Sequence, residues 1–181
     1  NKAIITVTAG AGATDGWIAD SQENLYAGTG AGANSTSDSC FNVAIGYKAL
    51  NTYASDGTFV GCNVAIGKCA GFCVSGSGGT GLGNVYLGNN AGRYHTTNNS
   101  VFIGHYTMAS DSSASGGADS VIIGARAGQC MRGNIRQVAI GCGAGCLNCL
   151  GDSNTFVGQG AAQSNKTGSN NSFFGDMCLL I

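Results

Sequence analysis

Short stretches of one polar residue, three mostly apolar residues and one glycine recur nine times along the chain. Successive stretches start 18, 21, 21, 16, 20, 17, 17 and 17 residues apart. Their first residues are Asn24, Asn42, Asn63, Asn84, Ser100, Ser120, Gln137, Asn154 and Asn171. A short motif that recurs at this period is typical of a solenoid, in which each repeat is one structural unit.

Each stretch predicts a short strand followed by a sharp corner. Three apolar residues are too few for a helix, and many of them are β-branched. Glycine at the fifth position permits a backbone corner that a side chain would forbid. A small residue follows at or near the eighth position, as Ala49 and Ala70 illustrate. The predicted corner glycines are Gly28, Gly46, Gly67, Gly88, Gly104, Gly124, Gly141, Gly158 and Gly175.

These features predict an all-β fold, a parallel β-solenoid (β-roll) of about nine coils. The repeat domain covers residues 24–181, and residues 1–23 form a non-repeat N-terminal segment in which residues 3–8 resemble a strand. At a strand spacing of about 4.8 Å, nine coils would make a rod roughly 40 Å long. The segments whose lengths vary between repeats are rich in Ser, Asn, Asp, Thr and Gly, which predicts surface loops.

Both faces of each predicted strand are apolar. The second and fourth positions point to one side, and the third, which is Tyr26 in the first repeat and Phe173 in the last, points to the other. Both faces should therefore be buried. A single thin roll can cover only one of them, so we expect a closed cyclic oligomer to cover the other. The alternative is a loop of the same chain that folds back over this face.

The first position is Asn in six repeats, which allows two interpretations. Stacked amides can hydrogen-bond along a solenoid as a ladder. Alternatively, they form a flat polar array that binds ice or a sugar. We favour the ladder, because ice-binding solenoids use regular arrays of Thr and this chain has no Thr column.

Repeats such as Asn42-Val-Ala-Ile-Gly46-Tyr-Lys-Ala49 resemble the head repeats of trimeric autotransporter adhesins, the YadA-like β-roll. Their longer spacing is closer to repeats in tail-fibre proteins of phages and large algal viruses. The resemblance covers about residues 24–179. It implies a homotrimeric β-roll and transfers no catalytic residue. Two departures weigh against the adhesin: the coils are longer, and nine Cys are unusual in a protein exported across two bacterial membranes.

Composition argues against several other functions. The net charge is −1, only 9% of residues are charged and no basic patch is visible, so nucleic acid is not an expected partner. No apolar run is long enough to span a membrane, so we expect no membrane insertion. With one Glu and with Asp residues in predicted turns, we expect no enzyme and no cofactor. His95 and His105 are expected to be ordinary surface or corner residues.

Cysteine is the unusual component, with nine residues and therefore at least one thiol unpaired within the chain. Cys142, Cys146 and Cys149 lack the paired knuckles of a zinc site and have no His nearby, so we predict no metal site. Cys130 and Cys146 fall at similar places in consecutive repeats, and a disulfide between them is a hypothesis that a Cα separation above about 7 Å would exclude. The favoured interpretation is that most Cys are small buried hydrophobes in a reducing cytoplasm.

The favoured function is a structural fibre or spike protein on a virion surface. A homotrimer would present variable loops to other virion or fibre proteins, or to a host surface glycan or protein. The alternatives are a bacterial adhesin head on the cell surface and an ice- or glycan-binding solenoid. Receptor-binding residues are not identified, although Tyr53 and Tyr94 are candidates as exposed loop aromatics.

Overall fold

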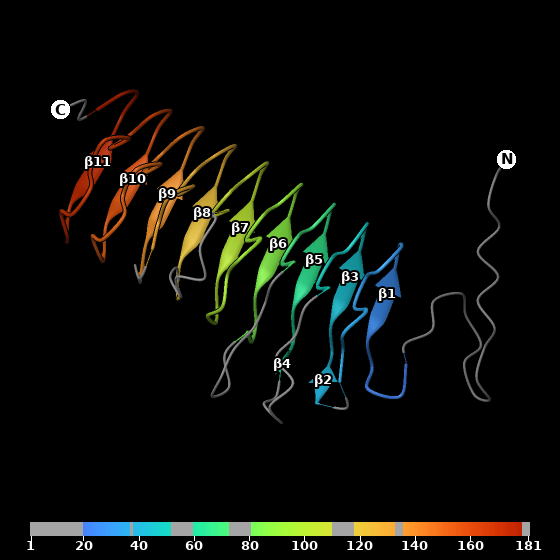
Figure 1. Cartoon of the computed structure of the whole chain (residues 1–181). Coiled ribbons are helices and arrows are strands. Elements are labelled where there is room, and N and C mark those ends of the chain that lie inside the picture. The colour runs from blue at the N-terminus through green and yellow to red at the C-terminus, as the bar shows by residue number, and fades with distance from the viewer. Residues whose placement is uncertain are drawn as a thin grey trace, which may run out of the picture.

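The computed structural model describes residues 20–36, 38–51, 60–72, 81–109, 118–132 and 136–178. Within these ranges the chain is all-β, with eleven short strands and no helix. The chain winds as a solenoid of about seven turns, and its strands lie side by side along a rod (Figure 1). The predicted all-β class and parallel solenoid are therefore confirmed, whereas the homotrimer stays a prediction. Nine closed coils stay a prediction, because several segments that return to the sheet include residues outside the described ranges. The strand predicted at residues 3–8 also lies outside the described residues.

Nine of the strands form one parallel sheet, in which each strand pairs with the strand of the next repeat. Equivalent positions face each other throughout, as when Val43 pairs with Val64 and Ile45 with Ile66. The strands of this sheet are β1 (Leu25–Ala27), β3 (Val43–Ile45), β5 (Val64–Ile66), β6 (Val85–Leu87), β7 (Val101–Ile103), β8 (Val121–Ile123), β9 (Val138–Ile140), β10 (Thr155–Val157) and β11 (Ser172–Phe174). A second parallel sheet pairs β2 (Ser39–Cys40) with β4 (Val60–Gly61).

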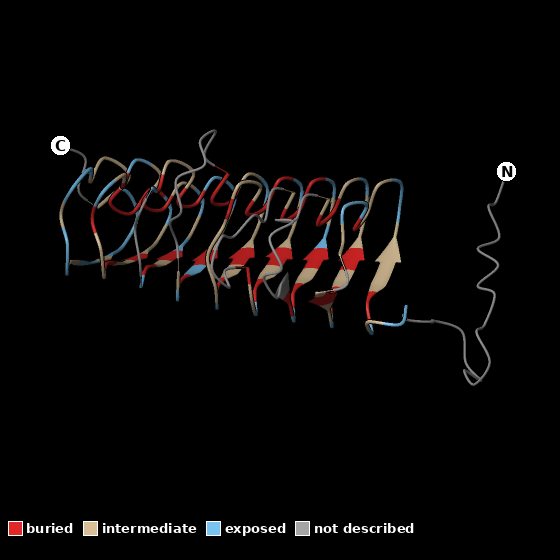
Figure 2. Ribbon diagram, turned by 60° about the horizontal axis from the view of Figure 1, so that its bottom comes forward, coloured by how far each residue is buried: buried red, intermediate tan, exposed pale blue. Residues whose placement is uncertain are grey.

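The interior of the roll is lined by the third position of each strand and by the eighth position across from it. Figure 2 shows this as a buried centre in the strands between β1 and β11. The third-position side chains from Ala44 to Phe156 have no exposed surface, and only Tyr26 and Phe173 at the ends are half-buried. Ala49, Ala70 and their equivalents close the opposite wall. Parallel backbone ladders and this narrow apolar interior together hold the rod.

Large and small side chains alternate within this interior. The coil that carries β5 is thin, because its third position is Ala65 and its ninth is Gly71. A Cβ added to Gly71 would lie 2.8 Å from a side-chain carbon of Leu50 and 2.8 Å from one of Tyr86. Leu50 and Tyr86 come from the two neighbouring coils, so they fill the space that the thin coil leaves. Interiors of proteins are close-packed, and the match therefore contributes to stability.

The corner glycines occupy a backbone region that side chains avoid, with φ between 120° and 135° in all nine repeats. From Gly28 to Gly158, each corner also packs under the corner of the next coil. A Cβ added to Gly46 would lie 2.6 Å from the carbonyl oxygen of Gly67, and one on Gly67 would lie 2.5 Å from that of Gly88. Glycine is therefore required here by both the dihedral angle and the close approach.

Three further positions of the repeat adopt left-handed backbone with φ between 43° and 72°. They are the residue before the first position, the seventh residue and the ninth residue. Many of these residues are not glycine, for example Lys48, Leu50 and Cys69. The segment after the corner is therefore a series of tight turns.

Candidate functional site

The outer face of the nine-stranded sheet presents a continuous row of apolar side chains that are not enclosed within the chain. The second and fourth side chains of each strand point away from the interior and are half-buried or exposed. Ile66 is 41% exposed, Ile140 is 37% exposed and Phe174 is 68% exposed. The second and fourth positions hold Leu25, Ala27, Val43, Ile45, Val64, Ile66, Val85, Leu87, Val101, Ile103, Val121, Ile123, Val138, Ile140, Thr155, Val157, Ser172 and Phe174. We call these residues the outer face.

Within a single chain, the expectation that both strand faces are buried is met for the interior face but not for the outer face. A single chain encloses the third position fully but leaves the outer face accessible along the whole sheet (Figure 2). No described segment of the same chain encloses it, so the alternative in which a loop folds back is not observed among the described residues. Large contiguous apolar surfaces on soluble proteins usually mark sites of association.

A buried column of polar side chains runs beside the outer face, at the first position of each repeat. The Asn24 Oδ1 atom accepts hydrogen bonds from the backbone N–H of Asn42 at 2.9 Å and from its Nδ2 at 3.0 Å. Asn63 repeats this arrangement on Asn42, and its own Oδ1 accepts the backbone N–H of Asn84 at 2.9 Å. The predicted ladder is confirmed, and the interpretation as an exposed amide array is wrong because the column is buried from Asn24 to Asn154.

Serine continues the ladder where asparagine is absent. The backbone N–H of Ser100 donates to Asn84 Oδ1 at 2.9 Å, and that of Gln137 donates to Ser120 Oγ at 2.9 Å. The sequence reasoning missed the serines, because it followed the Asn residues alone. From Asn24 to Ser120, and again at Asn154, each member accepts a hydrogen bond from the backbone N–H of the next coil, which satisfies N–H groups that are buried away from water.

Three neighbouring coils bring cations and aromatic rings together on the side of the tight turns. The Lys48 Nζ atom lies 5.4 Å from the ring centre of Tyr47 and 5.9 Å from that of Phe72. The Arg93 guanidinium lies 5.6 Å from Phe72 and 5.0 Å from Tyr94. These distances are typical of cation–π contacts. We call the five residues the cation–aromatic cluster.

The region around this cluster is positive even though the whole chain is almost neutral. The described residues between 39 and 109 include Lys48, Lys68 and Arg93 but no Asp or Glu. Tyr94, a candidate contact residue from the sequence, is half-buried in the cluster, and Tyr53 lies outside the described residues. Sequence reasoning could not find the cluster, because its members are about one repeat apart and meet only through the stacking of coils.

His95 is buried, so its assignment as a surface or corner residue is wrong. Its ring packs edge-on against Phe102 with a centroid distance of 4.5 Å. Its Nδ1 atom lies 2.9 Å from the Tyr86 hydroxyl, and Nε2 lies 2.7 Å from Thr97 Oγ1. Both ring nitrogens thus face hydroxyl groups, which makes burial tolerable for a polar ring. His105, by contrast, is exposed as expected.

The cysteines do not form a metal site among the described residues, where no three His, Cys, Asp or Glu side chains gather. Cys146 lines an open groove of about 270 Å³ together with Arg126, Gln129 and Cys142. Burial raises the pKa of Cys146, the neighbouring Cys130 raises it further, and the Arg126 charge opposes both effects. The structure does bring Cys130 and Cys146 together, in consecutive coils.

The comparisons with protein-family models, curated proteins and solved structures give no match to this chain. Among the described residues, no helix is long and apolar enough to cross a membrane. The fold and its surfaces define the chain as a β-solenoid repeat protein with an accessible apolar sheet face.

Proposed function

We propose that this chain is a structural fibre or spike protein of a virion that works as a homotrimeric β-roll of nine coils. The observation that carries the proposal is the outer face. It presents two side chains per strand along the entire nine-stranded sheet, most of them β-branched or Leu. Copies of the chain packed around an axis parallel to the rod would bury this face at every coil.

A repeating face favours identical partners. Each strand offers nearly the same apolar pair at the same spacing of about 4.8 Å, so a second copy matches it coil by coil. Three copies are what the resemblance to the adhesin heads and tail fibres implies. The cation–aromatic cluster and the loops then lie away from the axis, where threefold repetition gains avidity for a host glycan or protein. No catalytic step is needed for this role.

A bacterial trimeric adhesin head is the second candidate, because the same outer face supports the same assembly. The two functions differ in location, which immunogold labelling distinguishes. Antibodies against the chain should label purified virus particles if the first proposal holds, and the surface of bacterial cells if the second holds. The monomeric ice- or glycan-binding alternative is weaker, because the Asn column is buried.

Assembly is tested by sedimentation equilibrium of the purified chain. We expect a mass of three times 18.0 kDa. The double variant Ile66→Lys, Ile140→Lys places charges on the outer face and should sediment as a monomer. Ala125→Lys, at an exposed position beyond the corner, is the matched control and should remain a trimer. A wild-type chain that sediments as an 18.0 kDa monomer at micromolar concentration would overturn the proposal.

A further inference from the structure

Cys130 and Cys146 lie in consecutive coils at a separation that a disulfide can span. The backbone N–H of Cys130 donates to the carbonyl oxygen of Cys146 at 2.9 Å. Standard bond lengths on either side of this hydrogen bond place the two Cα atoms within about 7 Å of each other. Cys130 also contributes to raising the pKa of Cys146, as expected of a neighbouring thiol.

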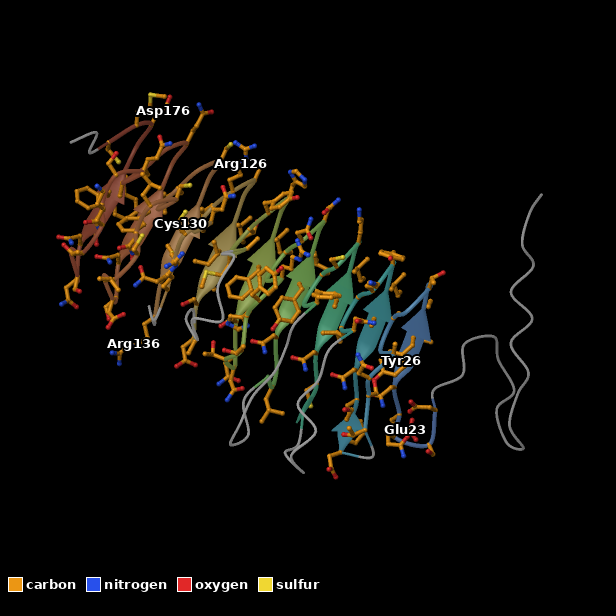
Figure 3. All side chains as sticks on the ribbon, viewed as in Figure 1. Glu23, Tyr26, Arg126, Cys130, Arg136 and Asp176 are labelled. Atoms are coloured by element: carbon orange, nitrogen blue, oxygen red, sulfur yellow. The ribbon has the colours of Figure 1, made fainter. Side chains whose placement is uncertain are left out.

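The surroundings give a soluble reagent access to this pair. Cys146 forms part of the wall of the open groove, whose lining includes the Arg126 cation and the Gln129 amide. The Cys146 Sγ atom lies 4.0 Å from Gln129 Oε1. Cys130 and Cys146 are both only partly buried, in contrast to Cys69, which is buried. Figure 3 labels both Cys130 and Arg126, which lie in the C-terminal half of the rod.

We propose that Cys130 and Cys146 form a redox-controlled staple between two consecutive coils, a dithiol in a reducing compartment and a disulfide in an oxidising one. This inference does not depend on the virion function or on trimer formation. It turns the disulfide hypothesis that the sequence offered for this pair into a redox-dependent modification site. In a solenoid each coil contacts only its neighbours, so one covalent link between coils opposes separation at that step.

The oxidant is a small disulfide such as oxidised glutathione. The Cys146 thiolate, reached through the groove, attacks one sulfur of this disulfide, forms a mixed disulfide and releases one small thiol. The Cys130 thiolate then attacks the Cys146 sulfur and releases the second small thiol. The two cysteines lose two electrons and two protons, and the small disulfide gains them as two thiols. Burial raises the pKa of Cys146 and the nearby Arg126 charge offsets this only in part, so the exchange should be faster at alkaline pH.

Peptide mapping of the full-length chain tests the staple directly. The reduced chain is incubated with oxidised glutathione, its remaining thiols are alkylated, and it is digested with trypsin. Cleavage after Arg126, Arg132, Arg136 and Lys166 puts Cys130 in peptide 127–132 and Cys146 in peptide 137–166. We expect these two peptides as one cross-linked species, about 2 Da lighter than their sum. Fragmentation then distinguishes Cys146 from the other cysteines in the larger peptide.

Two serine variants provide the controls. Cys146→Ser should abolish the cross-linked species, whereas Cys142→Ser, at the same groove, should retain it. Oxidation should raise Tm by roughly 5–10 °C in the wild type and in Cys142→Ser, but not in Cys146→Ser. If Cys146→Ser does not fold, mapping of the wild type decides alone. A link from Cys130 to Cys149, a link between chains, or glutathione retained on both cysteines would overturn the proposal.

Discussion

Replacing Gly67 by alanine tests the stacked corners, because it adds one methyl group at a point where two coils are in close contact. The new Cβ would lie 2.5 Å from the carbonyl oxygen of Gly88 and 2.7 Å from its carbonyl carbon, and φ at this residue is 135°. A side chain in such a backbone region costs about 1–3 kcal/mol, and forced overpacking costs roughly another 1–3 kcal/mol. We expect the free energy of unfolding to fall by on the order of 4 kcal/mol, which is a large share of a typical total.

Two controls separate the energetic cost of the backbone dihedral angle from the cost of the close contact with the next coil. Gly175 has a similar φ of 122°, but a Cβ there would meet no atom within 4 Å. Gly175→Ala should therefore cost only the backbone strain of about 1–3 kcal/mol. Gly143, which is in a central coil with φ of 67° and no atom within 4 Å, controls for the position along the rod. Gly143→Ala should cost about 1–2 kcal/mol.

The assay is guanidinium unfolding followed by far-ultraviolet circular dichroism. All variants are compared at one protein concentration, because association makes apparent stability depend on concentration. Equal m-values are required before the free energies are compared. The free energy of unfolding of Gly67→Ala should fall by at least about 1 kcal/mol more than that of either control, because only Gly67→Ala forces a close contact with the next coil. Equal losses for Gly67→Ala and Gly175→Ala would refute the assignment of the corners as stacked close contacts.

Three further predictions address the ladder, the buried phenol and the left-handed positions. Asn63→Ala should lower the free energy of unfolding by about 2–4 kcal/mol in urea titrations, because it leaves a buried N–H group unpaired, whereas Asn171→Ala at the open end should cost less than about 1 kcal/mol. Burial raises the pKa of Tyr86 above its ordinary value of 10.0. The contribution of the neutral phenol to the free energy of unfolding is therefore intact below pH 10 and falls at higher pH. Tyr86→Phe should cost about 1–3 kcal/mol at pH 7 but flatten the loss of stability between about pH 10 and 11.5, measured by urea unfolding across that range. Arg136→Gly, at an exposed site with φ of 55°, should raise the free energy of unfolding by roughly 0.5–1 kcal/mol, and Arg136→Ala should not.

The corner glycines could be predicted from the sequence because no other residue is tolerated there. At φ near 130° and under the next carbonyl, every repeat must use glycine, and the column is visible. The left-handed columns are not visible, because that region admits side chains at a cost of about 1–2 kcal/mol. Lys48 and Cys69 occupy one such column, and their residue types give no signal.

The sequence could not determine which strand face is internal. Period-two alternation separates the third position from the second and fourth, but both sets are apolar. The structure places the third position inside, where the side chain varies in size between residues such as Ala44 and Tyr86. It places the second and fourth positions, which are more uniform and mostly β-branched, outside. The interior set varies because each side chain must fit the volume left by adjoining coils. Adjoining coils do not enclose the outer face, so its side chains need not change in size from coil to coil and can keep a regular pattern.

The candidate contact surfaces were harder to predict because they depend on stacking distance and loop length. Lys48, Phe72 and Arg93 meet across three coils, and Lys48 does not occupy the repeat position that Phe72 and Arg93 share. His95 was misassigned for a related reason, since its burial comes from Tyr86 and Phe102 rather than from its own segment. The Cys130 and Cys146 pair was visible as a hypothesis, because both lie at similar places in their repeats.

The sizes of the interior side chains differ between most neighbouring coils. The thin coil with Ala65 and Gly71 accepts Leu50 from one side and Tyr86 from the other, and few other coils would fit between these two. A stack displaced by one repeat would leave a void at one level and a clash at another, although its backbone ladder would be nearly unchanged. The interior therefore fixes the order of the repeats, and it distinguishes the native rod from the many shifted stacks that the backbone alone would permit.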